Sequence, residues 1–135
     1  MAYIEWSERY SVKVPSLDEE HKRLFQMIDG FYSALKDGGH GEAMERLLEG
    51  LVEYVSVHFK HEEALMARSG FDGLAAQEAA HRAFAQKVLD VQKRFREGKL
   101  VLSYEITRFL KNWLTEHILQ ADTAYADSLV SAGIR

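Results

Sequence analysis

The sequence predicts an all-α fold, an antiparallel four-helix bundle with an extended N-terminal arm and a short C-terminal helix. Apolar residues recur at alternating spacings of three and four through four long segments, which is the periodicity of amphipathic helices. Short connections separate these segments, so successive helices are expected to run in opposite directions. We expect one domain over residues 1–135, with the arm at 1–16 and the bundle and C-terminal segment at 17–135.

Composition excludes several classes of protein. With 47% hydrophobic and 28% charged residues and a single proline, the chain is neither disordered nor fibrous. A net charge of −4 gives no electrostatic reason to expect nucleic acid or an anionic membrane as partner. The absence of cysteine excludes disulfides, thiolate metal sites and cysteine nucleophiles. No apolar run approaches the roughly 20 residues of a membrane span, so we expect a cytoplasmic protein. A four-helix bundle can be complete within one chain, so we also expect a monomer.

The N-terminal arm and the first helix meet at Pro15. Proline disfavours helix in the residue before it, and Ser16 with Glu19 forms a predicted capping box, so the first helix should run from there to about Lys36. The arm carries apolar side chains that can attach it to the bundle: Ile4, Trp6, Tyr10, Val12 and Val14. The inner face of the helix carries Leu17, His21, Leu24, Phe25, Ile28, Phe31, Tyr32 and Leu35.

Three further helices follow. The second is expected at about 41–68 and should end at Gly70. Asp72 is the expected cap of the third helix, which should stop at Gly98. The fourth should start near Ser103. The sequence shows no strand pattern and no internal repeat.

Residues that ligate metals interrupt the apolar faces of all four helices. A buried histidine or glutamate costs several kcal/mol unless it is paired or bound to metal. A hydrogen-bonded core histidine would explain one such residue, but four histidines and two carboxylates on inward faces are better explained by a metal site. The candidate ligands are His21, His58, Glu62, Gln77, His81, His117 and Asp122.

The number of candidate ligands indicates two metal ions. Six or seven donors are too many for one tetrahedral zinc, whereas two metals can share Glu62 and Asp122 as bridging carboxylates. Imidazole mixed with carboxylate suits iron, zinc, copper or manganese, and the residues alone leave that choice open. Asp122 lies five residues after His117, about 140° around a straight helix, so the fourth helix must break or pass through a π-type turn between them.

Five ordered segments resemble one known family. They are the arm with Trp6 and SVKV, DEEHKRLF around His21, HFKHEEALM around His58 and Glu62, HRAF around His81, and the late LTEHILQAD. Together they resemble the hemerythrins, and most closely the single-domain bacteriohemerythrins of bacteria. This resemblance covers nearly the whole chain. It implies reversible O₂ binding, for delivery, storage or sensing, at a non-haem di-iron centre with an oxo or hydroxo bridge.

The resemblance also implies a role for each ligand. By position it assigns His21 and His58 to the iron that leaves a place for O₂, residue 77 with His81 and His117 to the other iron, and Glu62 and Asp122 to the bridges. The chain departs from the family at Gln77, where the family has histidine. The amide oxygen of Gln77 is a weaker donor than imidazole, which predicts altered or less reversible O₂ binding. The other interpretation of Gln77 is that it is tolerated or only hydrogen-bonds a ligand. The alternative is an enzyme on the same scaffold, a di-iron oxidase, a peroxidase or a nitric-oxide-handling protein.

Several apolar residues are candidates for the wall of a dry O₂ pocket, although residues of this kind also form ordinary core. They are Phe25, Phe59, Trp113 and Leu114. His61 is expected to be a half-exposed surface residue, although it also suits a contact with a ligand. A ferritin-like site is disfavoured because the Glu-x-x-His pattern occurs once, and a zinc protease because H-E-x-x-H does not occur. An interaction bundle with a structural metal is the remaining alternative.

Overall fold

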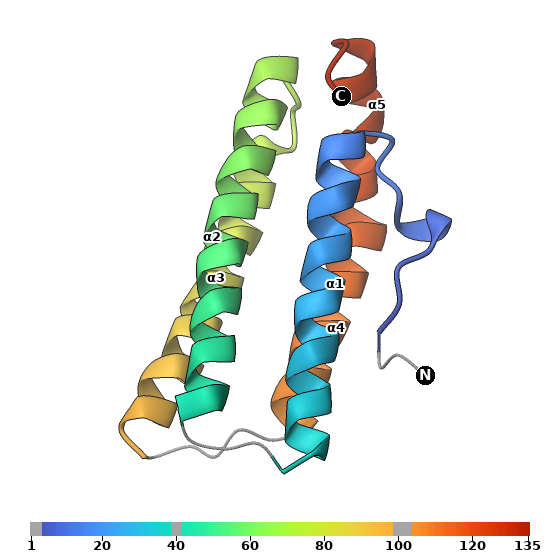
Figure 1. Cartoon of the computed structure of the whole chain (residues 1–135). Helices are drawn as coiled ribbons and strands as arrows, with labels where there is room; N and C mark the ends of the chain where they lie inside the picture. The colour runs from blue at the N-terminus through green and yellow to red at the C-terminus, as the bar shows by residue number, and fades with distance from the viewer. Residues whose placement is uncertain (1–3, 39–41, 99–103) are drawn as a thin grey trace.

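The computed structural model describes residues 4–38, 42–98 and 104–135 (Figure 1). The described part of the chain contains helices and no strand. Its elements, in chain order, are a 3-10 turn η1 (Glu8–Tyr10), α1 (Pro15–Lys36), α2 (Glu42–Ser69), α3 (Leu74–Arg96), α4 (Tyr104–His117), a π-helical turn η2 (Ile118–Asp122) and α5 (Thr123–Ser131).

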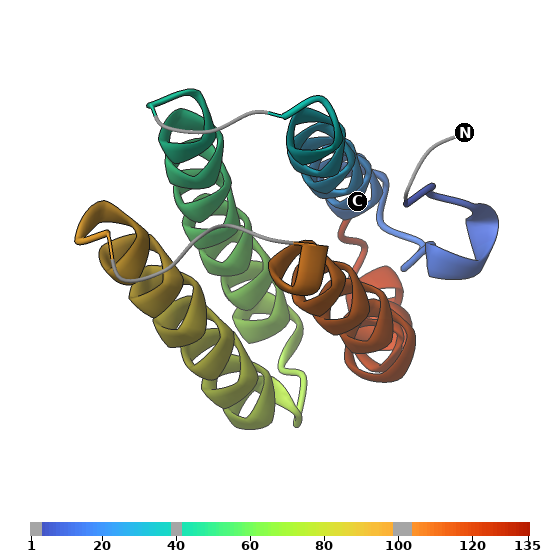
Figure 2. The ribbon, with the colours of Figure 1, turned by 90° about the horizontal axis from the view of Figure 1, so that it is seen from below.

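The four long helices form the predicted antiparallel bundle. Figure 1 shows α1 to α4 side by side, with α5 beyond the end of α4. In the view along the bundle, α1 lies beside both α2 and α4, and α3 packs against α2 (Figure 2). The N-terminal arm runs beside α1 on the side away from α3, and the short helix α5 contacts α2. The prediction of an all-α bundle with an arm and a short C-terminal helix is therefore confirmed.

The inward faces of the helices form a continuous apolar core, which the arm completes. Val12 and Val14 of the arm are fully buried. Asp18 at the start of α1 accepts hydrogen bonds from the backbone N–H of Val12, at 2.9 Å, and from the Ser11 hydroxyl, at 2.7 Å. The arm is thus attached both by burial of apolar side chains and by a carboxylate in the first turn of α1. Over the described residues, none of the helices is long and apolar enough to cross a membrane.

Two predicted helix starts were wrong. Helix α1 begins at Pro15 itself, so Ser16 lies inside the first turn, where its hydroxyl donates to the carbonyl oxygen of Arg135 at 3.2 Å instead of capping the helix. Proline is well suited to this first position because it has no N–H to satisfy. Helix α3 has Gly73, not Asp72, as its N-cap, since Gly73 accepts the backbone bond from Gln77 N. The predicted starts at residues 41 and 103 lie outside the described residues.

The predicted π-type turn between His117 and Asp122 is confirmed. Residues Ile118–Asp122 form a π-helix, in which the N–H of Thr123 bonds the carbonyl oxygen of Ile118 five residues earlier. The wider turn accommodates one additional residue without ending the helix. Both His117 and Asp122 therefore project toward the bundle interior.

Candidate metal centre

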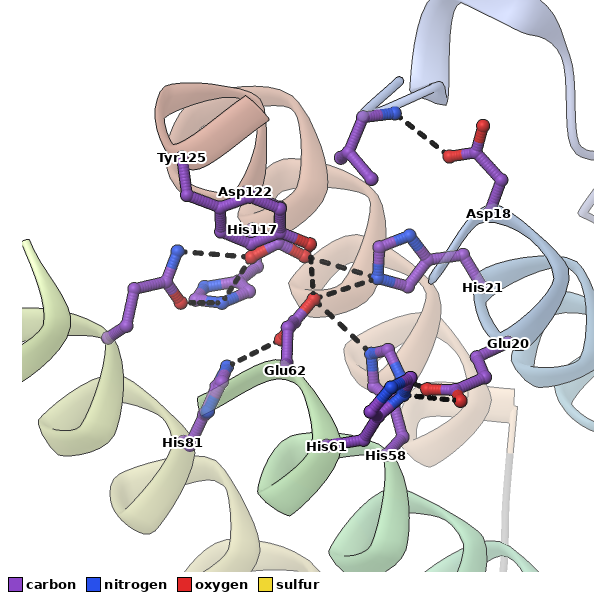
Figure 3. Close-up of polar contacts among 12 residues, drawn as sticks. Asp18, Glu20, His21, His58, His61, Glu62, His81, His117, Asp122 and Tyr125 are labelled. Atoms are coloured by element: carbon purple, nitrogen blue, oxygen red, sulfur yellow. Dashed lines mark hydrogen bonds and ion pairs between the residues drawn. The ribbon is translucent and has the colours of Figure 1, made fainter. Parts of the chain in front are cut away.

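The seven predicted ligand residues lie together inside the bundle, at the end where η2 and α5 join α4. His21 comes from α1 and His81 from α3, while His117 and Asp122 come from the end of α4 and from η2 (Figure 3). Glu62, from α2, lies between them and is fully buried. All seven side chains are nearly inaccessible to solvent. His117 is the most exposed histidine of the group, with 8% of its side chain exposed.

Six of these residues form two groups of metal-ligand type. One group contains His21, His58 and Glu62, and the other contains His81, His117 and Asp122. Within each group the potential ligand atoms lie within 4.8 Å of one another. Three nitrogen and oxygen donors around one point, in an otherwise apolar interior, suit a first-row divalent metal.

Both carboxylates reach from one group to the other. Glu62 Oε2 lies 3.1 Å from His21 Nε2, while Glu62 Oε1 lies 3.1 Å from His81 Nε2. Asp122 repeats this pattern, with Oδ2 at 3.3 Å from His21 Nε2 and Oδ1 at 3.1 Å from His117 Nε2. Each carboxylate thus directs one oxygen toward each pair of histidines. This is the orientation that two bridging carboxylates require.

Atoms without hydrogen-bond partners test whether the residues fit metal ions. Glu62 Oε1 and His81 Nε2 are buried and face each other at 3.1 Å, but neither makes a hydrogen bond within the part of the chain that the structure describes. Buried polar atoms of proteins nearly always have a partner, because an unpaired one costs about 1–3 kcal/mol. Both atoms are metal-ligand types, and both face the centre of the seven residues. A metal ion there would satisfy them, so the donor set fits a two-metal centre.

Two glutamates orient ligand histidines by hydrogen bonds to their Nδ1 atoms. His58 Nδ1 lies 2.7 Å from Glu20 Oε1, and His81 Nδ1 lies 2.7 Å from Glu63 Oε2. A carboxylate that accepts from one ring nitrogen leaves the other nitrogen deprotonated and directed at the metal position. Half-exposed as expected, His61 also bonds Glu20, with Nδ1 at 2.7 Å from Oε2.

Sequence analysis missed Glu20, Glu63 and Tyr125. The hydroxyl of Tyr125 in α5 donates to Glu62 Oε2 at 2.7 Å, and the tyrosine is fully buried. The available signal was adjacency, since Glu20 and Glu63 directly neighbour ligand residues and Tyr125 follows Asp122 by three positions. Adjacency alone does not say which side chain of another helix a residue will meet.

Without metal, the centre holds protons strongly. Burial disfavours a charged His58, but the Glu62 carboxylate and the hydrogen bond to Glu20 outweigh burial and raise the pKa of His58 to about 10. The pKa values of His21 and His81 are also raised, because carboxylate hydrogen bonds outweigh their burial. Burial would raise the pKa of Glu62, yet the charge of His58 and the imidazole hydrogen bonds hold it well below its usual value. Metal binding at this centre therefore displaces protons.

An apolar cavity lies next to aromatic side chains that stack on the ligand histidines. It has a volume of about 10 Å³, and its lining includes Phe59, Trp113 and Leu114 among other apolar side chains of the four long helices. Phe59 stacks on the ring of His81, with centroids 3.8 Å apart, and Trp113 stacks on His117 at 4.4 Å. Phe25 does not line this cavity, since its ring packs edge-on against Tyr10 at 5.1 Å.

Gln77 lies with the predicted ligands and is 4% exposed. Its amide nitrogen donates to Asp122 Oδ1 at 3.1 Å, and its amide oxygen lies 2.9 Å from His117 Nε2. Both ends of the amide therefore contact ligands of the second group. The amide oxygen is the only additional donor that this residue can offer a metal.

Fold and site together define a class, a four-helix bundle with a two-metal centre built from histidines and bridging carboxylates. The family model for the hemerythrin HHE cation binding domain matches residues 12–128. A bacteriohemerythrin of Methylococcus capsulatus is 32% identical over 130 residues, covering 96% of this chain and 98% of that protein. A myohemerythrin of Theromyzon tessulatum is 31% identical over 125 residues, with 93% and 92% covered.

Solved structures agree with the sequence comparisons. The wild type of a hemerythrin superposes with a TM-score of 0.89 at 30% identity, covering 95% of this chain and 98% of that one. The chain belongs to the hemerythrin family. With its histidine and carboxylate groups in place, it is a non-haem di-iron protein that binds O₂.

Proposed function

We propose that the chain holds one iron in each ligand group and binds O₂ reversibly at the iron of the first group. The assignment gives His21 and His58 to that iron, His81 and His117 to the other, and Glu62 and Asp122 to both. The observation that carries this proposal is the orientation of the two carboxylates, each of which directs one oxygen toward each group. When bound, iron(II) supplies the electrons that O₂ binding requires.

The residues around the centre keep it oriented and dry. Glu20 and Glu63 fix the ring positions of His58 and His81 through bonds to Nδ1. The cavity lined by Phe59, Trp113 and Leu114 is apolar and, at about 10 Å³, has room for about one water-sized molecule. An apolar wall next to the ligands slows the access of water and protons, which favours release of the gas over its reduction.

Gln77 modifies this function. In the proposed centre it supports His117 and Asp122 through its amide and contributes at most a weak oxygen donor to the second iron. We therefore propose O₂ binding that is less reversible than it would be with histidine at this position. The comparisons favour O₂ binding over the oxidase, peroxidase or nitric-oxide-handling alternative, because the compared relatives are hemerythrins.

We also propose that the protein acts as a monomer in the cytoplasm, as a single domain. The core is closed within one chain, since α1 to α4 bury their apolar faces against one another. Light scattering in solution tests the oligomeric state, with a mass near 15.5 kDa expected. A dimer would contradict this part of the proposal.

An optical O₂ titration of the anaerobically iron(II)-loaded protein tests the function. We expect a visible charge-transfer band that appears with O₂ and disappears when the gas is removed. The Gln77→His variant serves as the comparison and should survive more cycles of oxygenation before it oxidises. Equal behaviour of the two proteins would refute the role given to Gln77, and rapid irreversible oxidation of both would refute reversible binding.

A further inference from the structure

A second pocket reaches the metal centre from outside, between α3 and the η2–α5 turn. It has a volume of about 220 Å³ and an almost entirely apolar lining. Small residues dominate that lining, which consists of Phe71, Gly73, Ala76, Gln77, Ala80, His117, Ala121 and Ala124. Gln77 and His117 are its only polar members, and both belong to the second ligand group. The pocket therefore leads from the surface to Gln77, the one amide among the seven predicted ligands.

At Gln77 the chain offers a metal only a weak donor. Without Gln77, each ligand group has two imidazoles and shares the same two carboxylates, so the two metals are equally supplied. The Gln77 amide is engaged by His117 at 2.9 Å and Asp122 at 3.1 Å, which orients it toward other ligands. An imidazole in place of that amide would supply a stronger donor. The pocket therefore meets the second group at its weakest donor, the Gln77 amide.

We propose that this pocket is a binding site for a small neutral azole, or a nitrogen donor of similar size, which completes the second group in place of the Gln77 amide. The inference rests on the proposed two-metal function. An azole suits the pocket because its ring is flat and largely apolar, like the alanine walls, while its ring nitrogen is a stronger donor than the Gln77 amide oxygen. The ring displaces the Gln77 amide, so binding must overcome two hydrogen bonds.

The two sides of the centre differ in the ligand that they admit. The cavity beside Leu114 has a volume of about 10 Å³, which is close to the space of a single water molecule. This space is too small for a five-membered ring. An azole is therefore a probe that distinguishes the outer pocket from the inner cavity.

Imidazole titration of the full-length cobalt(II)-loaded protein tests the proposal, because cobalt(II) takes the same donors and reports its coordination by absorption. Calorimetry should give one imidazole per two cobalt ions, with a change in the cobalt spectrum. Gln77→Ala removes the competing amide and should bind imidazole about tenfold more tightly. Gln77→His supplies the donor from the chain and should bind none.

A matched pair of variants tests the route. Ala80, in the pocket wall, is half-buried, whereas Ala79 on the same helix is exposed and does not line the pocket. Ala80→Leu should abolish imidazole binding and keep both metals, while Ala79→Leu should change neither. Two cobalt ions without imidazole binding, equal binding in Gln77→His, or release of cobalt by imidazole would overturn the inference. Failure to load two metals would instead overturn the proposed function.

Discussion

Removal of the Tyr125 hydroxyl tests how much one buried hydrogen bond at the centre contributes to stability. Its hydroxyl donates to Glu62 Oε2 at 2.7 Å, and both groups are fully buried. Tyr125→Phe should lower the free energy of unfolding of the metal-free chain by about 1.5–3 kcal/mol, because a buried carboxylate loses a donor. Urea unfolding measures this change. Tyr10→Phe is the control, since the Tyr10 hydroxyl has no hydrogen bond among the described residues, and an equal loss in both variants would refute the role of Tyr125.

Substitution of Glu63 tests whether the carboxylate bonded to the Nδ1 of a ligand histidine strengthens metal binding. It accepts from His81 Nδ1 at 2.7 Å, which fixes the ring that ligates through Nε2. Glu63→Gln replaces the carboxylate with a neutral acceptor and should weaken metal affinity by about 10–100-fold. Competition with a chelator measures the affinity. Glu53→Gln, an exposed change on the same helix, should leave it unchanged.

At the residue scale, sequence reasoning reached the ligands but not the residues that support them. His58 and Glu62 share a helix face because four residues make about one turn, a relation that no other helix alters. The contacts of Glu20 with His58 and of Tyr125 with Glu62 join different helices. They depend on how far each helix is rotated and shifted in the bundle, which local spacing does not encode.

At the scale of elements, the turn between α2 and α3 connects the fold to the site. A Cβ added at Gly73 would lie 2.5 Å from the Phe71 ring, which itself packs edge-on against Tyr125 at 6.4 Å. Gly73→Ala should therefore displace Phe71 and destabilise the fold by about 1–3 kcal/mol. Gly30→Ala, in α1 with nothing near its added Cβ, should stabilise by about 0.5–1 kcal/mol. Thermal unfolding compares the two, and a tolerated Gly73→Ala would contradict this account.

The elements also show which boundaries a sequence can predict. The π-turn was predictable because a spacing of five residues from His117 to Asp122 is incompatible with one face of a straight helix. The start of α3 was not, since Asp72 and Gly73 are both acceptable caps. The backbone of the turn decided between them, with the N–H of Leu74 bonding the carbonyl oxygen of Phe71 at 3.3 Å.

At the scale of the whole molecule, pH couples folding to metal binding. The folded metal-free chain holds a proton on His58, whose pKa is raised from 6.5 to about 10. A raised histidine pKa stabilises the fold fully below pH 6.5, and this stabilisation is lost as the pH rises toward about 10. The free energy of unfolding of the chelator-treated chain should therefore fall over this range. Urea unfolding measures the fall, which His58→Gln should reduce, and a rise or a flat profile would contradict the assignment.

The bundle itself follows from patterns that act over the whole chain. Four periodic segments with short connections leave few arrangements that bury all inward faces, so the antiparallel bundle was predictable. The pocket beside Gln77 was not, because its walls combine alanines of α3 with alanines of η2 and α5. Its existence depends on how closely these elements approach one another, and small side chains are compatible with more than one such distance.

The most direct test of the two-metal O₂ site is the stoichiometry of iron and gas. The purified chain would be titrated anaerobically with iron(II), analysed for bound metal, and then exposed to O₂ and evacuated while gas uptake is measured. We predict saturation at two iron ions per chain, uptake of one O₂ and its recovery on evacuation. Saturation at one iron or none, or uptake of O₂ that is not returned, would contradict a reversible di-iron site built from these ligands.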